Sequence, residues 1–312
     1  MLRVVGADEI GDLDKSIVKE VLARAFSGLL SGSSVQPRQT VTELPGNAGD
    51  AIFYPGALVD LGVIGVKVSP YLSSLARAGL PPVTAYTLLL SVETGEPVLI
   101  CDSLGLTTIR TAATTALAID HLAPASSRNL TIFGAGKAAQ EHLSYALHAR
   151  PWDSITVYAR SLSGGDYEAG ERRDQLTERF GPLRFADSSD EAASDADVIL
   201  LCTSSGTPVV GDASVLRAKL VTSISTNVPG AHEINPKLLR ELDVYCDYRA
   251  TAPTTAGDFL LASQQSGWDP IEIVGDLAEL STGIVAPPDS ERPRYFRSTG
   301  LGIEDLAIAS LL

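Results

Sequence analysis

The sequence predicts an α/β protein in which a domain built on a parallel sheet is inserted into a second, α+β domain. A glycine motif, Gly134-x-Gly136-x-x-Ala139, stands between an apolar strand and an amphipathic helix. From Asn129 onward, short apolar strands alternate with helices, as they do in parallel sheets. A segment long enough for a separate domain precedes the motif, so the 312 residues are expected to form two domains.

The segment before the motif is predicted to contain one helix followed by strands. Apolar residues recur at helical spacing from Leu13 to Leu29 and predict an amphipathic helix that ends near Gly32. A helix from about 107 to 122 is expected to close this part, before a linker at 124–128. The strands expected between these helices are 63–68 and a hairpin of 84–92 with 97–101.

The glycine motif predicts a binding site for the phosphates of a dinucleotide. Gly134 allows a tight turn out of the strand, Gly136 lets the backbone approach a pyrophosphate, and Ala139 permits close packing of helix on strand. The N-terminus of the following helix offers N–H groups and a partial positive charge to the anion. The motif alone is weak evidence, but its strand and helix context favours a Rossmann-type cofactor domain.

Six strands are expected in this second domain: 130–133, 155–159, 183–186, 198–202, 220–224 and 244–246. The stretch 295–312 ends in a short amphipathic helix that has no obvious place in such a sheet, so it is expected to return to the first domain. The predicted division is therefore 1–125, completed by 294–312, for the first domain and 126–293 for the second.

Composition and charge exclude several classes of protein. No apolar run reaches the ~18 residues of a membrane span, so no membrane association is expected. The N-terminus lacks the apolar core of an export signal, which favours a cytoplasmic protein. A formal net charge of -14 makes nucleic acids poor partners. No metal site is expected, and three widely spaced cysteines predict buried thiols: Cys101, Cys202 and Cys246.

Three cationic residues of the first domain stand in unusual places. Arg38 follows a proline in a loop, Lys67 interrupts an apolar strand, and Arg110 opens an apolar helix. A buried cation without a partner costs several kcal/mol, so each must meet an anion or reach solvent. Internal ion pairs and a ligand carboxylate both satisfy this requirement, and a desolvated Lys67 is also a plausible proton donor.

Over nearly its whole length the chain resembles the ornithine cyclodeaminase/μ-crystallin family. An Arg-Thr-Ala-Ala sequence followed some twenty residues later by Gly-x-Gly is the specific part of the resemblance. The matching stretches are Val35–Arg38, Gly65–Lys67, Glu93–Pro97, Thr108–Ala113, Gly134–Gly136, Val228–Glu233, Phe296–Gly300 and Glu304–Ala307.

The resemblance implies a homodimer with a Rossmann-type parallel-sheet domain inserted into an α+β domain for substrate binding and dimerisation. The family includes cyclodeaminases, alanine dehydrogenase, reductases of ketimines and of Δ1-pyrroline-2-carboxylate, and a thyroid-hormone-binding crystallin. It therefore defines the fold better than the reaction.

By this resemblance, Arg38, Lys67 and Arg110 match the positions that hold the α-carboxylate of a 2-imino or 2-amino acid substrate. Lys67 would also serve the proton path, and hydride would pass between the carbon beside that carboxylate and the nicotinamide. The implied cofactor-binding residues are Arg110, Thr111, Gly134, Ala135, Gly136, Lys137, Ala138, Arg160, Ser161, Thr203, Ser204 and Ser298.

Asn227 departs from the family pattern, because cyclodeaminases carry an aspartate there that handles the amine protons of the substrate. An amide cannot act as a base, so Asn227 is expected to hydrogen-bond the substrate nitrogen instead. Pro82 also replaces a hydroxyl residue of the cyclodeaminase pattern. The alternative is that Glu233 replaces the missing carboxylate, although it more simply caps or pairs locally.

The end of the second strand of a Rossmann domain distinguishes NAD from NADP, because an acidic residue there binds the NAD ribose. The sequence Val157-Tyr-Ala-Arg160-Ser161 offers no acid, and Arg160 with Ser161 can meet a 2′-phosphate. NADP is therefore preferred over NAD, the alternative being a solvated arginine at a strand end.

These patterns together predict an NAD(P)-dependent reductase of small 2-imino acids or cyclic ketimines, working as an amino-acid dehydrogenase in reverse. The alternatives are an ornithine-type cyclodeaminase, which eliminates ammonia and recycles NAD, and a cofactor-loaded binding protein resembling μ-crystallin.

Overall fold

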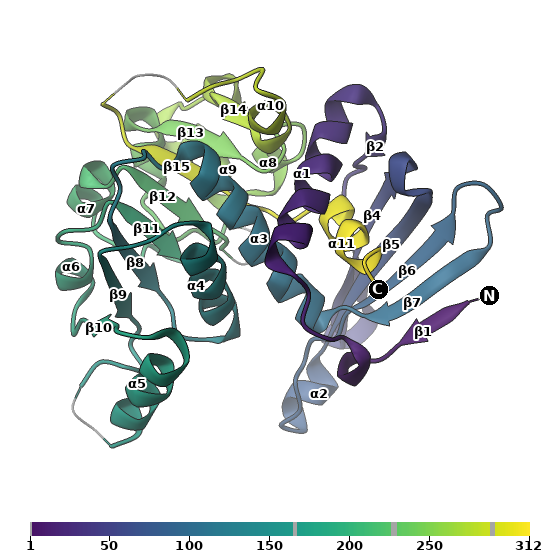
Figure 1. Ribbon diagram of the computed structural model, residues 1–312, viewed down its shortest axis with the longest axis horizontal. Coiled ribbons are helices and arrows are strands. Elements are labelled where there is room, and N and C mark those ends of the chain that lie inside the picture. The colour runs from purple at the N-terminus through teal and green to yellow at the C-terminus, as the bar shows by residue number, and fades with distance from the viewer. Residues whose placement is uncertain (1, 165–166, 226–229, 288–290) are drawn as a thin grey trace. The chain divides into compact units, whose positions relative to one another are not determined.

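The computed structural model describes residues 2–164, 167–225, 230–287 and 291–312. The chain divides into two compact units, Met1–Arg110 with Gly300–Leu312 and Thr111–Thr299 (Figure 1). The division falls within α3 (Leu104–Leu122) and not at the expected residue 125. Thr115 in the second half of this helix lies 3.0 Å from the Nε2 of His142, which belongs to the second unit. The compact units are defined by contacts within the fold, so the predicted limits of the two domains, 1–125 with 294–312 and 126–293, stay a prediction.

The first unit contains a mixed sheet of seven strands among the described residues. The strand order is β1-β7-β6-β5-β4-β2, with β3 also paired to β4, and every pair except β1 with β7 is antiparallel. The predicted strand at 63–68 and the predicted hairpin are both present. The strands are β1 (Arg3–Val5), β2 (Ser34–Val35), β3 (Thr40–Leu44), β4 (Gly49–Leu58), β5 (Val63–Leu72), β6 (Tyr86–Ser91) and β7 (Pro97–Asp102).

Two helices, α1 (Lys15–Ser31) and α11 (Gly302–Ala309), cover one face of this sheet. Asp14 caps α1 by accepting hydrogen bonds from the backbone N–H groups of Ser16 and Ile17, and Gly32 ends it with a φ of 83°. The C-terminal helix α11 packs between α1 and strands β4 and β5, so its predicted return to the first part of the chain is confirmed (Figure 1). A short helix, α2 (Ser73–Arg77), follows β5.

The opposite face of the first sheet is apolar. Because side chains alternate along strands, the residues that flank Lys67 and Thr87 point away from α11. Four of these large side chains are between 46% and 65% exposed: Val4, Val35, Ile64 and Tyr86. Their partly buried neighbours on the same face include Phe53, Val66, Val68, Leu88 and Ile100.

The second unit contains an all-parallel sheet of eight strands among the described residues, in the order β10-β9-β8-β11-β12-β15-β13-β14. All six predicted strands are present. The strands are β8 (Asn129–Phe133), β9 (Ser154–Tyr158), β10 (Arg184–Phe185), β11 (Val198–Leu201), β12 (Leu220–Ser223), β13 (Asp243–Cys246), β14 (Gly275–Asp276) and β15 (Arg294–Arg297).

The placement of residues 294–299 differs from the expectation. Arg294–Arg297 was expected to belong to the first domain, but it forms β15 between β12 and β13 of the second sheet. Four residues with an arginine at each end lack the apolar run by which a buried strand is recognised. The two-residue strand β14 is too short for any such pattern.

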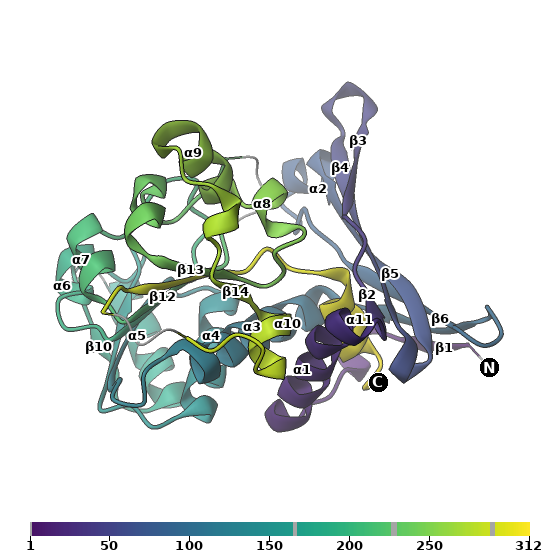
Figure 2. The ribbon, with the colours of Figure 1, turned by 90° about the horizontal axis from the view of Figure 1, so that it is seen from above.

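Helices cover both faces of the second sheet, with α4 and α9 on opposite sides of it (Figure 2). They are α4 (Lys137–Ala149), α5 (Tyr167–Phe180), α6 (Ser189–Ala192), α7 (Asp212–Arg217), α8 (Ala252–Thr255), α9 (Gly257–Ser266) and α10 (Leu277–Thr282). Short 3₁₀ helices lie at Ala7–Glu9, Pro45–Asn47, Val59–Leu61, Pro236–Glu241 and Pro270–Glu272. None of the helices in the described ranges is long and apolar enough to cross a membrane.

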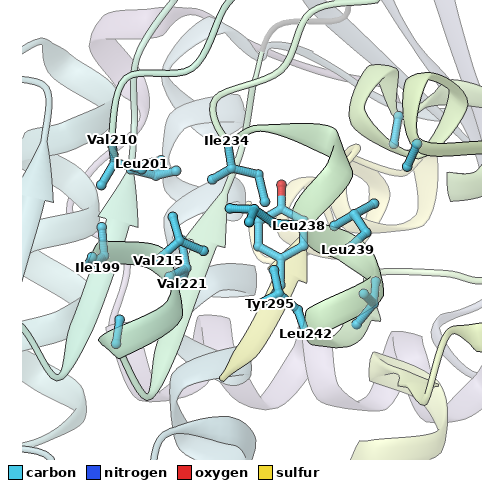
Figure 3. Packing of buried hydrophobic residues seen from close by; sticks show 14 of the residues in the cluster. Ile199, Leu201, Val210, Val215, Val221, Ile234, Leu238, Leu239, Leu242 and Tyr295 are labelled. Atoms are coloured by element: carbon cyan, nitrogen blue, oxygen red, sulfur yellow. The ribbon is translucent and has the colours of Figure 1, made fainter. Parts of the chain in front are cut away.

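The core of the second unit is formed by side chains from β11 and β12 that meet the 3₁₀ helix Pro236–Glu241 (Figure 3). Ile199, Val221 and Leu239 are among its fully buried members. Burial of each such side chain is worth about 1.5–3 kcal/mol relative to exposure. This core fixes the strands whose carboxyl ends carry the residues considered next.

Candidate functional site

The turn between β8 and α4 has the geometry that the glycine motif predicts. Gly134 has a φ of 119°, and a Cβ there would lie 2.4 Å from the carbonyl oxygen of Cys202 and 3.3 Å from the Cβ of Ala139. Only glycine fits this position. Gly136 caps α4, and a Cβ there would meet nothing within 4 Å, so the space in front of the helix N-terminus is open. The turn therefore fits a pyrophosphate.

The predicted cofactor residues of the second unit gather at the carboxyl ends of neighbouring parallel strands. From β8 the chain first adds β9 and β10 on one side, and it then returns to add β11 and β12 on the other side of β8. The order in which strands are added therefore reverses between β8 and β11. Ligands of open parallel sheets bind at such a switch point. These residues follow β8 (Gly134, Ala135, Gly136, Lys137, Ala138), β9 (Arg160, Ser161), β11 (Thr203, Ser204) and β15 (Ser298).

A pocket of about 520 Å³ lies beside this turn, within the second unit. Ala135 and Gly136 line it from the glycine turn, and Ser161 lines it from the end of β9. Arg160 is exposed and is not among the lining residues. The lining instead includes Arg172 and Arg179 of α5, to which the sequence interpretation gave no role.

Glu233 is fully buried and ties two loops of the second unit together. Its carboxylate accepts hydrogen bonds from the backbone N–H and the hydroxyl of Thr203, at 2.8 and 2.7 Å, and from Ser223 and the N–H of Ser225. These four donors occupy the carboxylate, so the local role expected for Glu233 fits better than that of a base. Asn227 lies outside the described residues.

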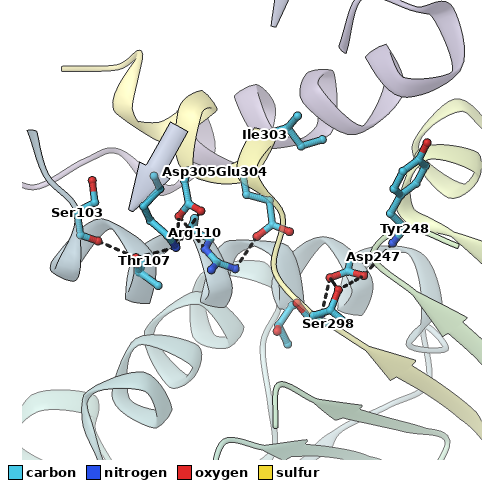
Figure 4. A network of polar contacts seen from close by, with 12 residues as sticks. Ser103, Thr107, Arg110, Asp247, Tyr248, Ser298, Ile303, Glu304 and Asp305 are labelled. Carbon is cyan, nitrogen blue, oxygen red and sulfur yellow. Dashed lines mark hydrogen bonds and ion pairs between the residues drawn. The ribbon is translucent and has the colours of Figure 1, made fainter. Parts of the chain in front are cut away.

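A second buried network supports the segment after β15. Asp258 accepts hydrogen bonds from the hydroxyl of Tyr295 at 2.6 Å and from the Nε of Arg297 at 3.1 Å. Asp247 accepts hydrogen bonds from the backbone N–H and the hydroxyl of Thr299 (Figure 4). Ser298 between them is buried, and its hydroxyl makes no hydrogen bond within the described part of the chain. An unsatisfied buried hydroxyl fits the role of a ligand contact that was expected for Ser298.

Lys67 and Arg110 come together in the first unit, in a buried cluster with two acids of α11. The Nζ of Lys67 lies 2.9 Å from Asp305, and Arg110 contacts Asp305 through Nε at 3.1 Å and Glu304 through Nη1 at 2.9 Å (Figure 4). Lys67 also donates to Thr107 at 3.4 Å. The internal ion pairs left open as an alternative are therefore present, and we call these four charged residues the α11 cluster.

The α11 cluster shifts the protonation of both cations. Burial lowers the pKa of Lys67 to about 8, against the attraction of Asp305 and with added repulsion from Arg110. Burial also disfavours the charge of Arg110, but Asp305 and Glu304 outweigh it and raise the pKa of the guanidinium. Arg110 is thus always charged, whereas Lys67 can exchange a proton near neutral pH.

Arg38 is exposed after β2 and makes no ion pair within the described residues. Gly300 packs against Arg110 with a φ of 79°, and a Cβ there would lie 2.5 Å from its Nη1. The sequence signal for Glu304 and Asp305 was two adjacent acids in an apolar helix, which require buried cations as partners.

The described residues contain no group of three or more histidines, cysteines or acids arranged to hold a metal ion. The three cysteines are buried free thiols, as predicted. Burial raises the pKa of Cys202 and of Cys246 well above the usual value, so these thiols are unreactive. Burial lowers the pKa of His142 to about 4, so its neutral ring donates to Ala138 and accepts from Thr115.

Comparison with known proteins gives consistent matches over the whole chain. A model of the ornithine cyclodeaminase/mu-crystallin family matches residues 7–312. NAD(P)H-dependent anabolic L-arginine dehydrogenase DauB of Pseudomonas aeruginosa is 46% identical over 296 residues, which are 95% of this chain and 91% of that protein.

Two solved structures illustrate the similarity of fold. Thermococcus litoralis Δ1-pyrroline-2-carboxylate reductase in complex with NADH and L-proline superimposes with a TM-score of 0.88 at 25% identity, covering 99% of this chain and 95% of that one. An archaeal alanine dehydrogenase dimer with bound NAD gives a TM-score of 0.87 at 22% identity, covering 99% and 93%.

Proposed function

Because the chain belongs to the ornithine cyclodeaminase/mu-crystallin family, we propose that it reduces a small 2-imino acid with a cationic side chain to the corresponding amino acid. The reaction class is an NAD(P)H-dependent reduction of imino acids. The observation that carries the narrower substrate is the 46% identity to an L-arginine dehydrogenase over 95% of the chain.

The α11 cluster supports a role for Lys67 and Arg110 at the substrate carboxylate. Arg110 has five N–H donors, and its contacts to Asp305 and Glu304 use two of them. The acids hold the guanidinium in a fixed orientation, so its remaining fork can receive a planar carboxylate. Arg38, exposed after β2, would add a further positive charge.

Lys67 is suited to hold the proton that the substrate nitrogen needs. Asp305 keeps the ammonium charged below pH 8, and burial makes its release of a proton easy near neutral pH. Bound NAD(P)H supplies the hydride. Asn227 would hydrogen-bond the substrate nitrogen, and since an amide is no base, this residue argues against cyclisation of ornithine.

We also propose a preference for NADPH over NADH. No acid follows β9, where NAD-dependent enzymes bind the ribose, so no carboxylate at this strand end would repel a 2′-phosphate. The protein is expected to work in the cytoplasm. The three cysteines are buried free thiols, and a reducing compartment keeps such thiols reduced.

A homodimer is proposed through the apolar face of the first sheet. This face carries the exposed side chains of Val4, Ile64 and Tyr86 together with partly buried aliphatic neighbours, and a contiguous apolar surface of this kind marks an interaction site. Its occupant is taken to be a second copy of the chain, and the archaeal alanine dehydrogenase of similar fold is also a dimer. No nucleic acid or membrane is expected to bind this acidic chain.

The test is to follow oxidation of NADPH with purified protein, ammonia and a panel of 2-keto acids, and separately with cyclic ketimines. We expect turnover with the 2-keto acid that carries a guanidinium, and L-arginine as the product. Release of ammonia from L-ornithine without net change in cofactor would replace this proposal by a cyclodeaminase. Tight NADPH binding without turnover of any substrate would replace it by a binding protein.

A further inference from the structure

One face of α5 lines the pocket beside the glycine turn. Four lining residues belong to α5, and their spacing of three, four and seven places them on one side of the helix. They are Arg172, Gln175, Leu176 and Arg179. Leu176 is buried and anchors this face of the helix, and the two arginines lie on either side of it in the wall of the pocket.

The charge of this wall is unusual for the chain. The whole sequence has a formal net charge of -14, yet the lining of the pocket contains two guanidinium groups and no acid. Arg172 meets Glu168 at 3.9 Å between exposed side chains, a contact that contributes little. Two arginines in a lining that contains no acid suit an anion with several oxygens, such as a phosphate.

Arg179 is already oriented by its neighbours. Its Nη1 donates to the side chain of Gln140 at 2.8 Å, and Gln140 in turn donates to the carbonyl of Ala135 in the glycine turn. The guanidinium also lies 4.9 Å from the ring centroid of Phe180. Through Gln140, Arg179 is linked to the same turn that fits the pyrophosphate.

We infer that Arg172 and Arg179 of α5 bind the 2′-phosphate of NADPH and determine the preference for it, whereas Arg160 does not. The inference rests on the proposed binding of the cofactor at the glycine turn. By the general geometry of such turns, the N-terminus of α4 would hold the pyrophosphate, and the end of the second strand would contact the adenosine ribose. Ser161 of that strand end lines the same pocket as the two arginines, and Arg160 does not. A volume of about 520 Å³ is typical of a small-molecule site.

The experiment is calorimetric titration of the full chain with 2′,5′-ADP, 5′-AMP, NADPH and NADH. The variants are Arg172→Ala, Arg179→Ala, their combination, and Arg160→Ala as the competing assignment. Arg24→Ala on α1, an exposed arginine of the first unit, is the matched control for loss of one charge. Thermal denaturation verifies that each variant folds.

In the wild type, 2′,5′-ADP should bind at least about 10-fold more tightly than 5′-AMP, a difference of about 1.4 kcal/mol. Each α5 variant should weaken 2′,5′-ADP and NADPH by about 10-fold and the double variant by more, with 5′-AMP and NADH within about 2-fold. Arg160→Ala and Arg24→Ala should leave two ratios of affinity unchanged, that of 2′,5′-ADP to 5′-AMP and that of NADPH to NADH.

Loss of the NADPH preference in Arg160→Ala, with the preference intact in the α5 double variant, would overturn the inference and leave the proposed reductase untouched. Equal loss of NADH and NADPH in the α5 variants would also overturn it, because the arginines would then not discriminate. A wild type that binds neither cofactor would refute the proposed function itself.

Discussion

Lys67 lies on a strand between apolar neighbours and keeps its charge only because α11 supplies Asp305 at 2.9 Å. Desolvation lowers the pKa of the ammonium to about 8, so protonated and neutral forms are both accessible near neutral pH. A residue with this property is a suitable proton donor in a reduction, since its pKa lies near the working pH.

The first prediction concerns the dependence of reduction on pH. Lys67 must be protonated to donate, so kcat/KM for the 2-imino acid should be constant below the pKa and fall as pH rises through about 8. In Asp305→Asn, loss of the carboxylate removes the attraction that raises the pKa of Lys67, so the fall should begin at lower pH. A pH profile of kcat/KM for both proteins checks this, and an identical inflection in the two would show that Lys67 is not the group that titrates.

Arg110 is predicted to act through the geometry of its fork rather than through its charge alone. Arg110→Lys keeps the charge but loses bidentate contacts to a carboxylate and one contact to the α11 acids. We expect kcat/KM to fall by roughly 10- to 1000-fold, about 1.4–4 kcal/mol. Steady-state kinetics decide the matter, with Arg24→Lys as the control, and an unchanged kcat/KM would rule out the carboxylate assignment.

The sequence was sufficient to identify the buried cations but not their partners. Lys67 and Arg110 stood out because each interrupts an apolar element. Asp305 is 238 residues from Lys67 along the chain, and only the packing of α11 on β5 brings them together. Arg172 and Arg179 were missed because α5 is polar on most sides, so nothing in the sequence indicates which side faces a pocket.

At the scale of elements, the two glycines of the turn from β8 to α4 are required for different reasons. Gly134 has a positive φ and backbone atoms close to where a Cβ would stand, so its role is conformational. Gly136 has an ordinary φ of -73° and open space before it, so its role is to leave room for a ligand.

This contrast gives a third prediction. Gly134→Ala should destabilise the fold by about 1–3 kcal/mol and lower the melting temperature, because a Cβ would clash with the carbonyl of Cys202. Gly136→Ala should leave the melting temperature of the free protein nearly unchanged and weaken NAD(P)H binding. Differential scanning calorimetry and cofactor titration measure the two effects. Equal losses of stability in both variants would contradict the division of roles.

The elements that the sequence predicted share one property, a continuous apolar or alternating pattern. Strands β8, β9, β11 and β12 are of this kind. Strand β4 was not predicted, because Pro55 and Gly56 interrupt it and both residues are typical of turns. Strand β15 was not predicted because arginines flank its two aromatic residues, and Arg297 is buried through a partner, Asp258, that only the fold provides.

At the scale of the whole molecule, the apolar face of the first sheet is the surface proposed for dimerisation. The sheet is covered by α1 and α11 on one side and carries the exposed side chains of Ile64 and Tyr86 on the other, where a partner would remove them from water. The proposed partner is a second copy of the chain, for which a self-complementary surface suffices.

The fourth prediction follows from that face. Ile64→Glu places a charge in the centre of the apolar patch, where it would be desolvated by a partner, and should shift the protein from dimer to monomer. Ile271→Glu, at an exposed position of the second unit, is the control and should leave the dimer intact. Sedimentation velocity distinguishes the two species. A wild-type protein that sediments as a monomer at micromolar concentration would contradict the proposed interface.

The late position of β15 and α11 in the chain has a consequence for synthesis on the ribosome. Proteins emerge with the N-terminus first, and each unit contains a segment that emerges after most of the elements with which it packs. Until Arg294–Arg297 arrives, β12 and β13 have no strand between them, and until Gly302–Ala309 arrives, Lys67 and Arg110 have no acids. Until these segments emerge, the nascent chain exposes unpaired strands and uncovered apolar faces in both units, and such surfaces promote aggregation. Chaperones that hold such surfaces would be most needed during this interval, and premature termination before residue 294 would leave neither unit able to close.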